Sequence, residues 1–172
     1  TSLIYDGNVV GTVTAGEKQF AVVNTKLVIW PDKKYLDLNT STLHELGASA
    51  EKANAVVTTD SITMTGAGLS SKFSAGDGVT ISGCTTKKEN NKDLVIKAVD
   101  GDKLTFSANA LVACTEAGTM KIERKIPDLD FICESENRLW GVSNANKTIY
   151  ASSLGDPKNF FVYQGISTDS YA

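Results

Sequence analysis

Short apolar and β-branched runs, separated by turn residues, constrain the fold of this chain more than any other feature. Alternation of apolar and polar residues over about four to eight positions is typical of strands. The runs expected to form strands are Asn8–Thr14, Gln19–Val23, Leu27–Trp30, Ile62–Thr65, Val79–Ser82, Leu94–Val99, Lys103–Ser107 and Met120–Arg124. Turn motifs such as DGN, TAGE, AGDG and ENNK lie between them. The sequence therefore predicts an all-β fold.

Two local patterns give more specific expectations. The tetrapeptide DGDK separates two strand-like runs, and Asp-Gly tolerates the positive φ angles of a tight hairpin turn, so we expect a hairpin over Leu94–Ser107. Helical signals are confined to STLHELGASAEKAN. Ser41 is placed there as a helix cap, Glu45 follows it, and Gly47 is a stop, which predicts one or two helical turns.

Aromatic residues divide the chain into three parts. Residues 52–125 contain no Trp or Tyr and have only Phe73 and Phe106 as aromatics, whereas both flanking segments are rich in them. A compositional change that reverses is typical of a small domain inserted into a loop of a larger one. We therefore expect residues 1–51 and 126–172 to form one discontinuous aromatic-rich β unit and residues 52–125 to form an inserted β-domain. Five short strands in the insert predict a small barrel or sandwich.

The flanking segments contain two similar hairpins. Both Leu27–Leu38 and Asn137–Leu154 combine a strand with Trp, a polar turn and a strand with Tyr. Repeated aromatic hairpins are typical of β-propellers. Two unrelated hairpins are the alternative, because Trp and Tyr favour strands in any protein. We expect both hairpins to lie in one propeller-like unit, with Trp140 in its core.

Composition excludes several classes of function. The 172 residues are 41% hydrophobic and 22% charged, which allows a folded core. A net charge of -3 argues against a nucleic-acid partner, since phosphate backbones attract basic surfaces. Apolar runs such as LVIW are too short for membrane insertion. Cys84, Cys114 and Cys133 lack metal-site spacing and are expected to be small buried residues.

No catalytic or metal-binding constellation stands out, and we expect neither a cofactor nor an enzyme. His44 is the single histidine and is expected at the surface or as a cap. Asp156 in SLGDPKNF is read as a turn residue. The hydrolase alternative depends on spaced carboxylates, and the candidates are Asp128, Asp130 and Glu134.

Two further groups of residues each have two possible interpretations. Asp32, Lys33 and Lys34 follow Trp30 and Pro31, and a solvated hairpin tip is favoured over a substrate site. Asp100 and Asp102 resemble part of a calcium loop, but the downstream Glu of such a loop is absent, which favours a hairpin turn.

Aromatic side chains are the candidate binding residues. Flat apolar rings with polar edges suit sugars, and the candidates are Trp140, Tyr150 and Tyr163. Packing between sheets uses the same residue types, and core packing is the favoured interpretation.

Two motif regions also support a family resemblance. The segment from Ile126 to Ala172 contains DFICE, NRLWG, TIYASSLGDPKNF and GISTDSY in that order. The upstream segment LVIWPDKKYLDL and the block GDGVTISGCTT to KLTF precede it. This arrangement resembles structural proteins of tailed bacteriophages and prophages, most specifically over Asp32–Tyr35 and Asn137–Phe160.

The resemblance implies a structural role and no catalytic activity. It implies a non-enzymatic virion component of the tail or head–tail region, synthesised in the bacterial cytoplasm and assembled with other virion proteins and with itself. It also implies that the chain is a fragment of a longer protein with further propeller-like strands. The alternative is a receptor- or glycan-binding module that recognises a host-surface glycan.

Overall fold

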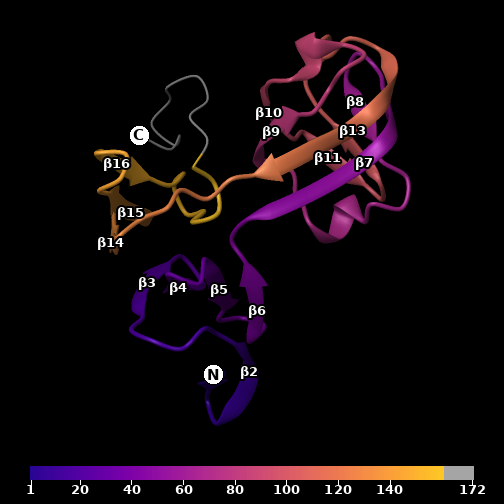
Figure 1. Cartoon of the computed structure of the whole chain (residues 1–172). Helices are drawn as coiled ribbons and strands as arrows, with labels where there is room; N and C mark the ends of the chain where they lie inside the picture. Colours follow the sequence, from indigo (N-terminus) through magenta and orange to yellow (C-terminus); the bar gives the residue numbers. More distant parts are fainter. Residues whose placement is uncertain (161–172) are drawn as a thin grey trace. The chain divides into compact units, whose positions relative to one another are not determined.

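The structure is a computed structural model that describes residues 1–160, and within them the fold is all-β. The regular structure in this range consists of strands and two 3-10 helices, Leu69–Ser71 and Lys88–Asn90. The chain divides into two compact units (Figure 1). Unit 1 comprises Thr1–Gly47 and Ile126–Ala172, and unit 2 comprises Ala48–Lys125.

Unit 1 contains a four-stranded antiparallel meander. Its strands, in sheet order, are β3 (Gln19–Val23), β4 (Lys26–Trp30), β5 (Lys34–Asp37) and β6 (Thr42–Glu45). Asn24 supplies a positive φ in the two-residue turn between β3 and β4, which is a conformation that Asn adopts more readily than most residues. The LVIW run lies in β4, the second strand of this sheet, where Val28, Ile29 and Trp30 are all buried. Apolar residues on both faces of β4 therefore imply cover on both faces of the sheet.

A second antiparallel meander of unit 1 has three strands. They are β14 (Phe131–Ser135), β15 (Arg138–Ser143) and β16 (Thr148–Ala151). Glu136 and Asn137 both have positive φ in the tight turn between β14 and β15, as a primed hairpin turn requires. The expected Trp hairpins correspond to β4–β5 and β15–β16, and they lie in different sheets of the same unit.

The two meanders of unit 1 pack together through an apolar core. The cluster joins Val28 and Trp30 of the first sheet to Leu129 and Leu139 of the second segment. The Trp30 indole Nε1 donates a hydrogen bond of 2.6 Å to the Leu129 carbonyl, so this buried ring leaves no unpaired donor. Gln19 joins the same two sheets, because its Nε2 donates to the Asp130 carbonyl at 2.9 Å.

The opposite face of the four-stranded sheet is covered in part by a hairpin. This hairpin consists of β1 (Ser2–Tyr5) and β2 (Asn8–Thr12), joined by an Asp-Gly turn with positive φ at both residues. Gly11 of β2 faces β6 so closely that a Cβ there would lie 2.5 Å from Leu43 Cδ2. The order of layers in unit 1 is therefore the β1–β2 hairpin, the four-stranded sheet and the three-stranded sheet.

Unit 2 is built on one seven-stranded antiparallel sheet. The longest pairing joins β7 (Ala48–Val57) to β13 (Cys114–Arg124). The other strands are β8 (Ser61–Thr63), β9 (Gly78–Ser82), β10 (Asp93–Val95), β11 (Ala98–Asp100) and β12 (Lys103–Thr105). The sheet order is β10-β9-β13-β7-β8-β12-β11, and its core includes Phe73 and Phe106. The edge strands β10 and β11 are separated by two residues, so the sheet must curl, yet it does not close.

Two expectations for the strands of unit 2 are corrected. The insert has seven strands in one open sheet rather than five strands in a small barrel or sandwich. The run Leu94–Val99 is not one strand, because it breaks at Ile96 and Lys97 and supplies both edges of that sheet. Ile96 is buried and its N–H bonds to the Asp77 carbonyl, which fixes the break. The hairpin turn at DGDK is present between β11 and β12.

The helix expected near Ser41 is also wrong, because this segment forms β6 and the start of β7. His44 of β6 pairs with Tyr35 of β5, and the two rings stack with centroids 5.0 Å apart. Ala48–Val57 pairs along β13, and this long ladder outweighs a weak local helix preference. The first boundary between the units therefore lies at Gly47, before residue 52.

Candidate functional site

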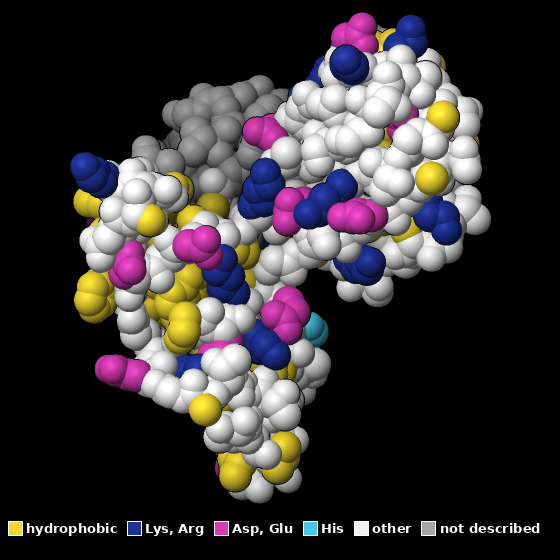
Figure 2. All heavy atoms as spheres, viewed as in Figure 1, with side chains coloured by type: hydrophobic (Ala, Val, Ile, Leu, Met, Phe, Trp, Pro, Cys, Tyr) yellow, Lys and Arg dark blue, Asp and Glu magenta, His cyan; other side chains and the backbone are white. Residues whose placement is uncertain are grey.

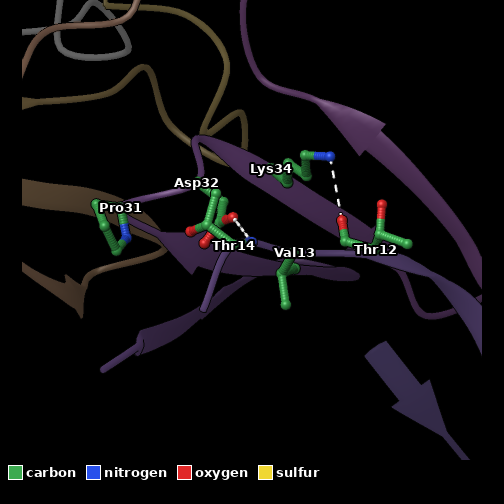
Figure 3. A pocket seen from close by; sticks show the side chains of 6 residues that line it. All are labelled: Thr12, Val13, Thr14, Pro31, Asp32 and Lys34. Carbon is green, nitrogen blue, oxygen red and sulfur yellow. Dashed lines mark hydrogen bonds between the residues drawn. The ribbon is translucent and has the colours of Figure 1, made fainter. Parts of the chain in front are cut away.

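An open hollow lies beside the β4–β5 turn in unit 1 (Figure 3). It has a volume of about 570 Å³. Its lining consists of Thr12, Val13, Thr14, Pro31, Asp32 and Lys34. Three of these residues come from the end of β2 and the segment after it, and three from the β4–β5 turn and the first residue of β5. The Trp30–Pro31 peptide bond in this turn is cis.

Asp32 is the most tightly held polar group of this hollow. Its side chain is 1% exposed, and its Oδ2 lies 2.5 Å from Lys18 Nζ. Its Oδ1 accepts a hydrogen bond of 2.6 Å from the Thr14 N–H. Burial alone raises the pKa of Asp32, but the bonds from Lys18 and Thr14 outweigh burial and hold this pKa below its usual value. Asp32 is therefore a charged, paired carboxylate.

The expected solvated tip is thus wrong for Asp32, whose carboxylate is enclosed by the segment after β2. Lys18 Nζ also donates to Thr14 Oγ1 at 2.7 Å, which closes a small network. Lys34 Nζ donates to the Thr12 carbonyl at 3.2 Å and forms an ion pair with Glu45. A carboxylate occupied in this way fixes the loop rather than serving as a general base, since a base needs a free lone pair near a substrate.

The outer face of the three-stranded sheet is the second candidate, and we name it the C-terminal face. It consists of Phe131, Cys133, Trp140, Val142 and Ile149. Phe131 pairs with Val142, which pairs with Ile149, so these three side chains form one cross-strand row. Their exposed fractions are 65%, 36% and 61%. Cys133 and Trp140 form the adjacent pair on this face.

The C-terminal face surrounds a shallow hollow of about 380 Å³. Phe131, Trp140 and Ile149 line it, and Ser135 is its one hydroxyl side chain. Figure 2 shows hydrophobic side chains gathered over the region of β14 to β16. The Trp140 indole Nε1 donates to the Ser135 carbonyl at 3.1 Å, so the ring presents an apolar surface without a free donor. The C-terminal face is therefore suited to contact with apolar groups.

The candidate aromatics occupy different environments. Trp140 is half-buried and lies on the C-terminal face, so the expectation that it belongs to the core is wrong. Tyr150 is on the other face of the sheet, packs against the core of unit 1, and has its hydroxyl 3.4 Å from Asn146 Nδ2. Tyr163 lies outside the described residues. Trp140 and Tyr150 therefore do not form a joint site.

The three carboxylates of the hydrolase alternative each have a local partner. Asp128 Oδ1 forms an ion pair with Lys33 at 2.5 Å. Asp130 Oδ2 accepts from the Asn144 N–H at 2.7 Å, and Glu134 Oε1 accepts from the Asn137 N–H at 2.8 Å. Asp130 and Glu134 therefore stabilise hairpin turns. Asp156 likewise lies in a turn, where its Oδ1 accepts from the Lys158 N–H.

Unit 2 contains a second enclosed carboxylate, which the sequence did not single out. Glu116 is buried, and its Oε1 accepts hydrogen bonds from Thr85 Oγ1 at 2.7 Å and from the Gly118 N–H at 3.0 Å. Thr86 donates to it through both N–H and Oγ1. Burial alone raises the pKa of Glu116, but these donors lower it to about 2. Glu116 thereby fixes the irregular pairing of β13 with β7 between Glu116 and Thr119.

The cysteines differ in environment. Burial, with a contribution from Glu116, raises the pKa of Cys84 to about 11. Burial also raises the pKa of Cys114. Thiolates are the reactive form, so neither thiol is prepared for nucleophilic chemistry. Cys133 is exposed on the C-terminal face, which corrects the expectation that it is buried.

Residues 1–160 contain no group of three or more His, Cys, Asp or Glu side chains arranged to hold a metal ion. In the same residues, no helix has the length and hydropathy needed to cross a membrane. Comparison with protein-family models, with curated proteins and with solved structures found no match for the chain. The C-terminal face, with its exposed apolar side chains, is the candidate binding surface of unit 1.

Sequence reasoning missed most of this face, although a signal for it was present. In β14 and β15 the stretches FIC and LWGV place apolar residues at both alternating positions. Such continuous runs are consistent with a strand buried on both faces. The sequence did not indicate Phe131 and Ile149 as binding residues. The pattern of one strand does not show which of its two faces the rest of the chain covers.

Proposed function

We propose that this chain is a non-enzymatic structural component of a bacteriophage or prophage particle, in the tail or head–tail region, and that it acts through protein–protein contacts. The observation that carries the proposal is the apolar C-terminal face, where Phe131 and Ile149 are each more than half exposed. Exposed apolar patches of this kind mark interaction sites. The phage setting is supported by the sequence resemblance of Asp32–Tyr35 and Asn137–Phe160.

The layered organisation of unit 1 supports a partial propeller-like unit. Antiparallel meanders follow one another in chain order, and each packs its face on the next. Propeller blades have this arrangement, and their strands give rigid surfaces for assembly. In this proposal, the partners are other virion proteins and further copies of the chain, and no cofactor takes part.

Mass spectrometry of purified particles tests the proposal. After prophage induction, particles are banded on a density gradient and digested, and we expect peptides of this chain to band with the capsid proteins. The same fraction from uninduced cells is the control. Intact particles that lack these peptides would contradict a virion role.

A glycan-binding module is the second candidate, favoured by the Trp140 and Phe131 rings that line the hollow of the C-terminal face. Sugar recognition also needs polar groups, and this hollow offers few, since the Trp140 N–H is already bonded to Ser135. A glycan array tests this candidate. Specific binding that is lost in Trp140→Ala supports it, and an array without signal removes it.

A further inference from the structure

Three Asp-Gly dipeptides lie in turn motifs of the sequence, and the proposed virion role uses none of them. They are Asp6–Gly7 in DGN, Asp77–Gly78 in AGDG and Asp100–Gly101 in DGDK. An aspartate before glycine is open to rearrangement without an enzyme, because glycine has no side chain to keep its backbone nitrogen away from the carboxyl group. The three dipeptides have the same chemistry in different environments, so the fold decides which of them reacts.

The pair Asp6–Gly7 forms the exposed two-residue turn of the β1–β2 hairpin. Both residues have positive φ, as a primed turn requires. Within residues 1–160, the Asp6 carboxylate forms no hydrogen bond or ion pair, and neither residue is bonded to a segment outside the hairpin. A Cβ built on Gly7 would meet no atom beyond its chain neighbours within 4 Å. The two reacting groups are therefore held only by the turn itself.

The pair Asp77–Gly78 is buried and fixed at both residues. The Asp77 side chain is 1% exposed and forms an ion pair with Arg124. Its carboxylate also accepts a hydrogen bond of 2.8 Å from the Ser74 N–H. Gly78 is buried in β9, where it pairs with Val95 of β10. The carboxyl carbon and the glycine nitrogen of this pair cannot approach each other unless part of unit 2 unfolds.

The pair Asp100–Gly101 is exposed, but its turn is anchored to another segment of unit 2. The next residue, Asp102, accepts hydrogen bonds through its carboxylate from the N–H groups of Gly66 at 2.5 Å and Gly68 at 2.7 Å. These bonds fix the β11–β12 turn, so its backbone must break them before the glycine nitrogen turns toward the Asp100 carboxyl group.

We propose that Asp6–Gly7 is a site of spontaneous modification, at which Asp6 is converted into isoaspartate. The Gly7 nitrogen attacks the side-chain carboxyl carbon of Asp6, so a C–N bond forms and a C–O bond breaks. The nitrogen's proton and the carboxyl hydroxyl leave as water, and the product is a five-membered succinimide. Water then opens the ring at either carbonyl, which restores aspartate or leaves the main chain running through the side-chain carbon. The net reaction needs no oxidant or cofactor, and it is independent of the virion role.

Isoaspartate adds one carbon to the backbone of the turn. A two-residue primed turn matches the twist of its strands through positive φ at both positions, and an extra carbon removes this match. An isolated two-stranded hairpin has little stability of its own. The β1–β2 hairpin lies on the four-stranded sheet, where Gly11 is close to Leu43 of β6. Conversion of Asp6 should therefore loosen this layer of unit 1.

Peptide mapping of the aged chain tests the site. Trypsin cleaves after Lys and Arg, so the three pairs fall on separate peptides, residues 1–18, 73–87 and 98–103. The folded chain is incubated below its unfolding temperature and digested, and each isoaspartate peptide is separated by chromatography from its parent of equal mass. We expect conversion in peptide 1–18 to be at least about tenfold faster than in 98–103, whose turn must first break hydrogen bonds. Peptide 73–87 should stay unchanged, and equal rates in all three peptides would overturn the proposal.

An unfolded control and one substitution separate the effect of the fold from that of the sequence. In guanidinium chloride we expect all three peptides to react at similar rates, and a preference for peptide 1–18 that persists there would contradict selection by the fold. Asp102→Ala removes the anchor of the β11–β12 turn and should raise the rate in peptide 98–103 toward that in 1–18. An unchanged rate in the folded variant, verified by far-UV circular dichroism, would show that the anchor does not protect Asp100.

Hydrogen exchange tests the effect on the hairpin. The isoaspartate form of the intact chain is separated from the unaged chain, which is the control. We expect the backbone amides of β1 and β2 to exchange about tenfold faster in the isoaspartate form, because the hairpin opens more often. Amides of unit 2 should exchange as in the control. Exchange of β1 and β2 at the control rate would overturn the loosening of this layer.

Discussion

Trp30 and Trp140 occupy opposite environments, although each lies in the first strand of a similar hairpin. Trp30 is 2% exposed and bonds through its indole to Leu129, whereas Trp140 is half-buried on the C-terminal face. The difference follows from strand position. Trp30 belongs to the face shared by two sheets, and Trp140 points away from that core.

Truncating each Trp should therefore have different effects on stability. Trp30→Ala leaves a cavity and an unbonded Leu129 carbonyl, so we expect it to lower the free energy of unfolding by about 3–5 kcal/mol. Trp140→Ala should cost about 1 kcal/mol, the common value for point substitutions. Urea unfolding followed by far-UV circular dichroism measures both. Equal losses would show that Trp140 is as well packed as Trp30.

Glu116 makes a pH-dependent contribution to the stability of unit 2. Its pKa falls from the ordinary 4.5 to about 2 in the folded chain, so its charged form stabilises the fold above the ordinary pKa. This contribution is lost as pH falls toward 2. Glu116→Gln should lower the urea midpoint at neutral pH, and the difference from wild type should shrink in acid. Glu89→Gln, at an exposed site of the 3-10 helix Lys88–Asn90, is the control and should change the midpoint little at either pH.

At the scale of elements, a buried ion pair anchors the end of β13. Arg124 Nη1 bonds to Asp77 Oδ2, and the side chains are 6% and 1% exposed. Asp77 also receives the Ser74 N–H, so the pair joins β13 to the loop that precedes β9. A charge enclosed in this way depends on its partner, since desolvation of a lone ion is expensive.

Arg124→Met should therefore be strongly destabilising. It leaves the Asp77 carboxylate buried without this partner, and we expect a loss of about 3–5 kcal/mol in the free energy of unfolding. Replacing both residues, with Asp77→Leu added to Arg124→Met, should recover part of the loss because no buried charge is left. Urea midpoints of the two variants provide the measurement. A double variant less stable than the single one would indicate that the pair acts mainly by geometry.

At the scale of the whole molecule, the described residues 1–160 form two apolar cores that share no residue. One includes Val28, Trp30 and Leu139, and the other includes Phe73 and Phe106. Residues that share one core unfold cooperatively, so we expect each unit to have its own unfolding transition. Both Trp residues of the chain lie in unit 1, which makes their fluorescence a probe of that unit alone.

Core substitutions in one unit should thus leave the other transition in place. Phe106→Ala should cost about 3–5 kcal/mol in unit 2, because it empties a fully buried site. We expect it to lower the far-UV transition of that unit while the Trp fluorescence transition stays at its wild-type urea concentration. Trp30→Ala should do the converse. A fluorescence midpoint that moves with Phe106→Ala would contradict independent unfolding.

The sequence by itself determined the all-β class and several exact elements of this protein. Alternation and turn chemistry act locally, so Gln19–Val23 and the DGDK hairpin were predictable from neighbouring residues alone. The aromatic distribution likewise indicated separate outer and middle segments. None of these signals depends on residues that are distant in the chain.

Tertiary structure decided which faces are covered and which carboxylates are enclosed. Ala48–Val57 is a strand because β13 pairs with it. Asp32 is shielded from solvent because Lys18 and Thr14 contact its carboxylate. Trp140 became a surface residue because the core of unit 1 lies on the other side of its sheet. A strand pattern specifies the two faces of a strand but not what packs against each face. In the described residues, tertiary packing covers the inner face of the three-stranded sheet and leaves the C-terminal face exposed.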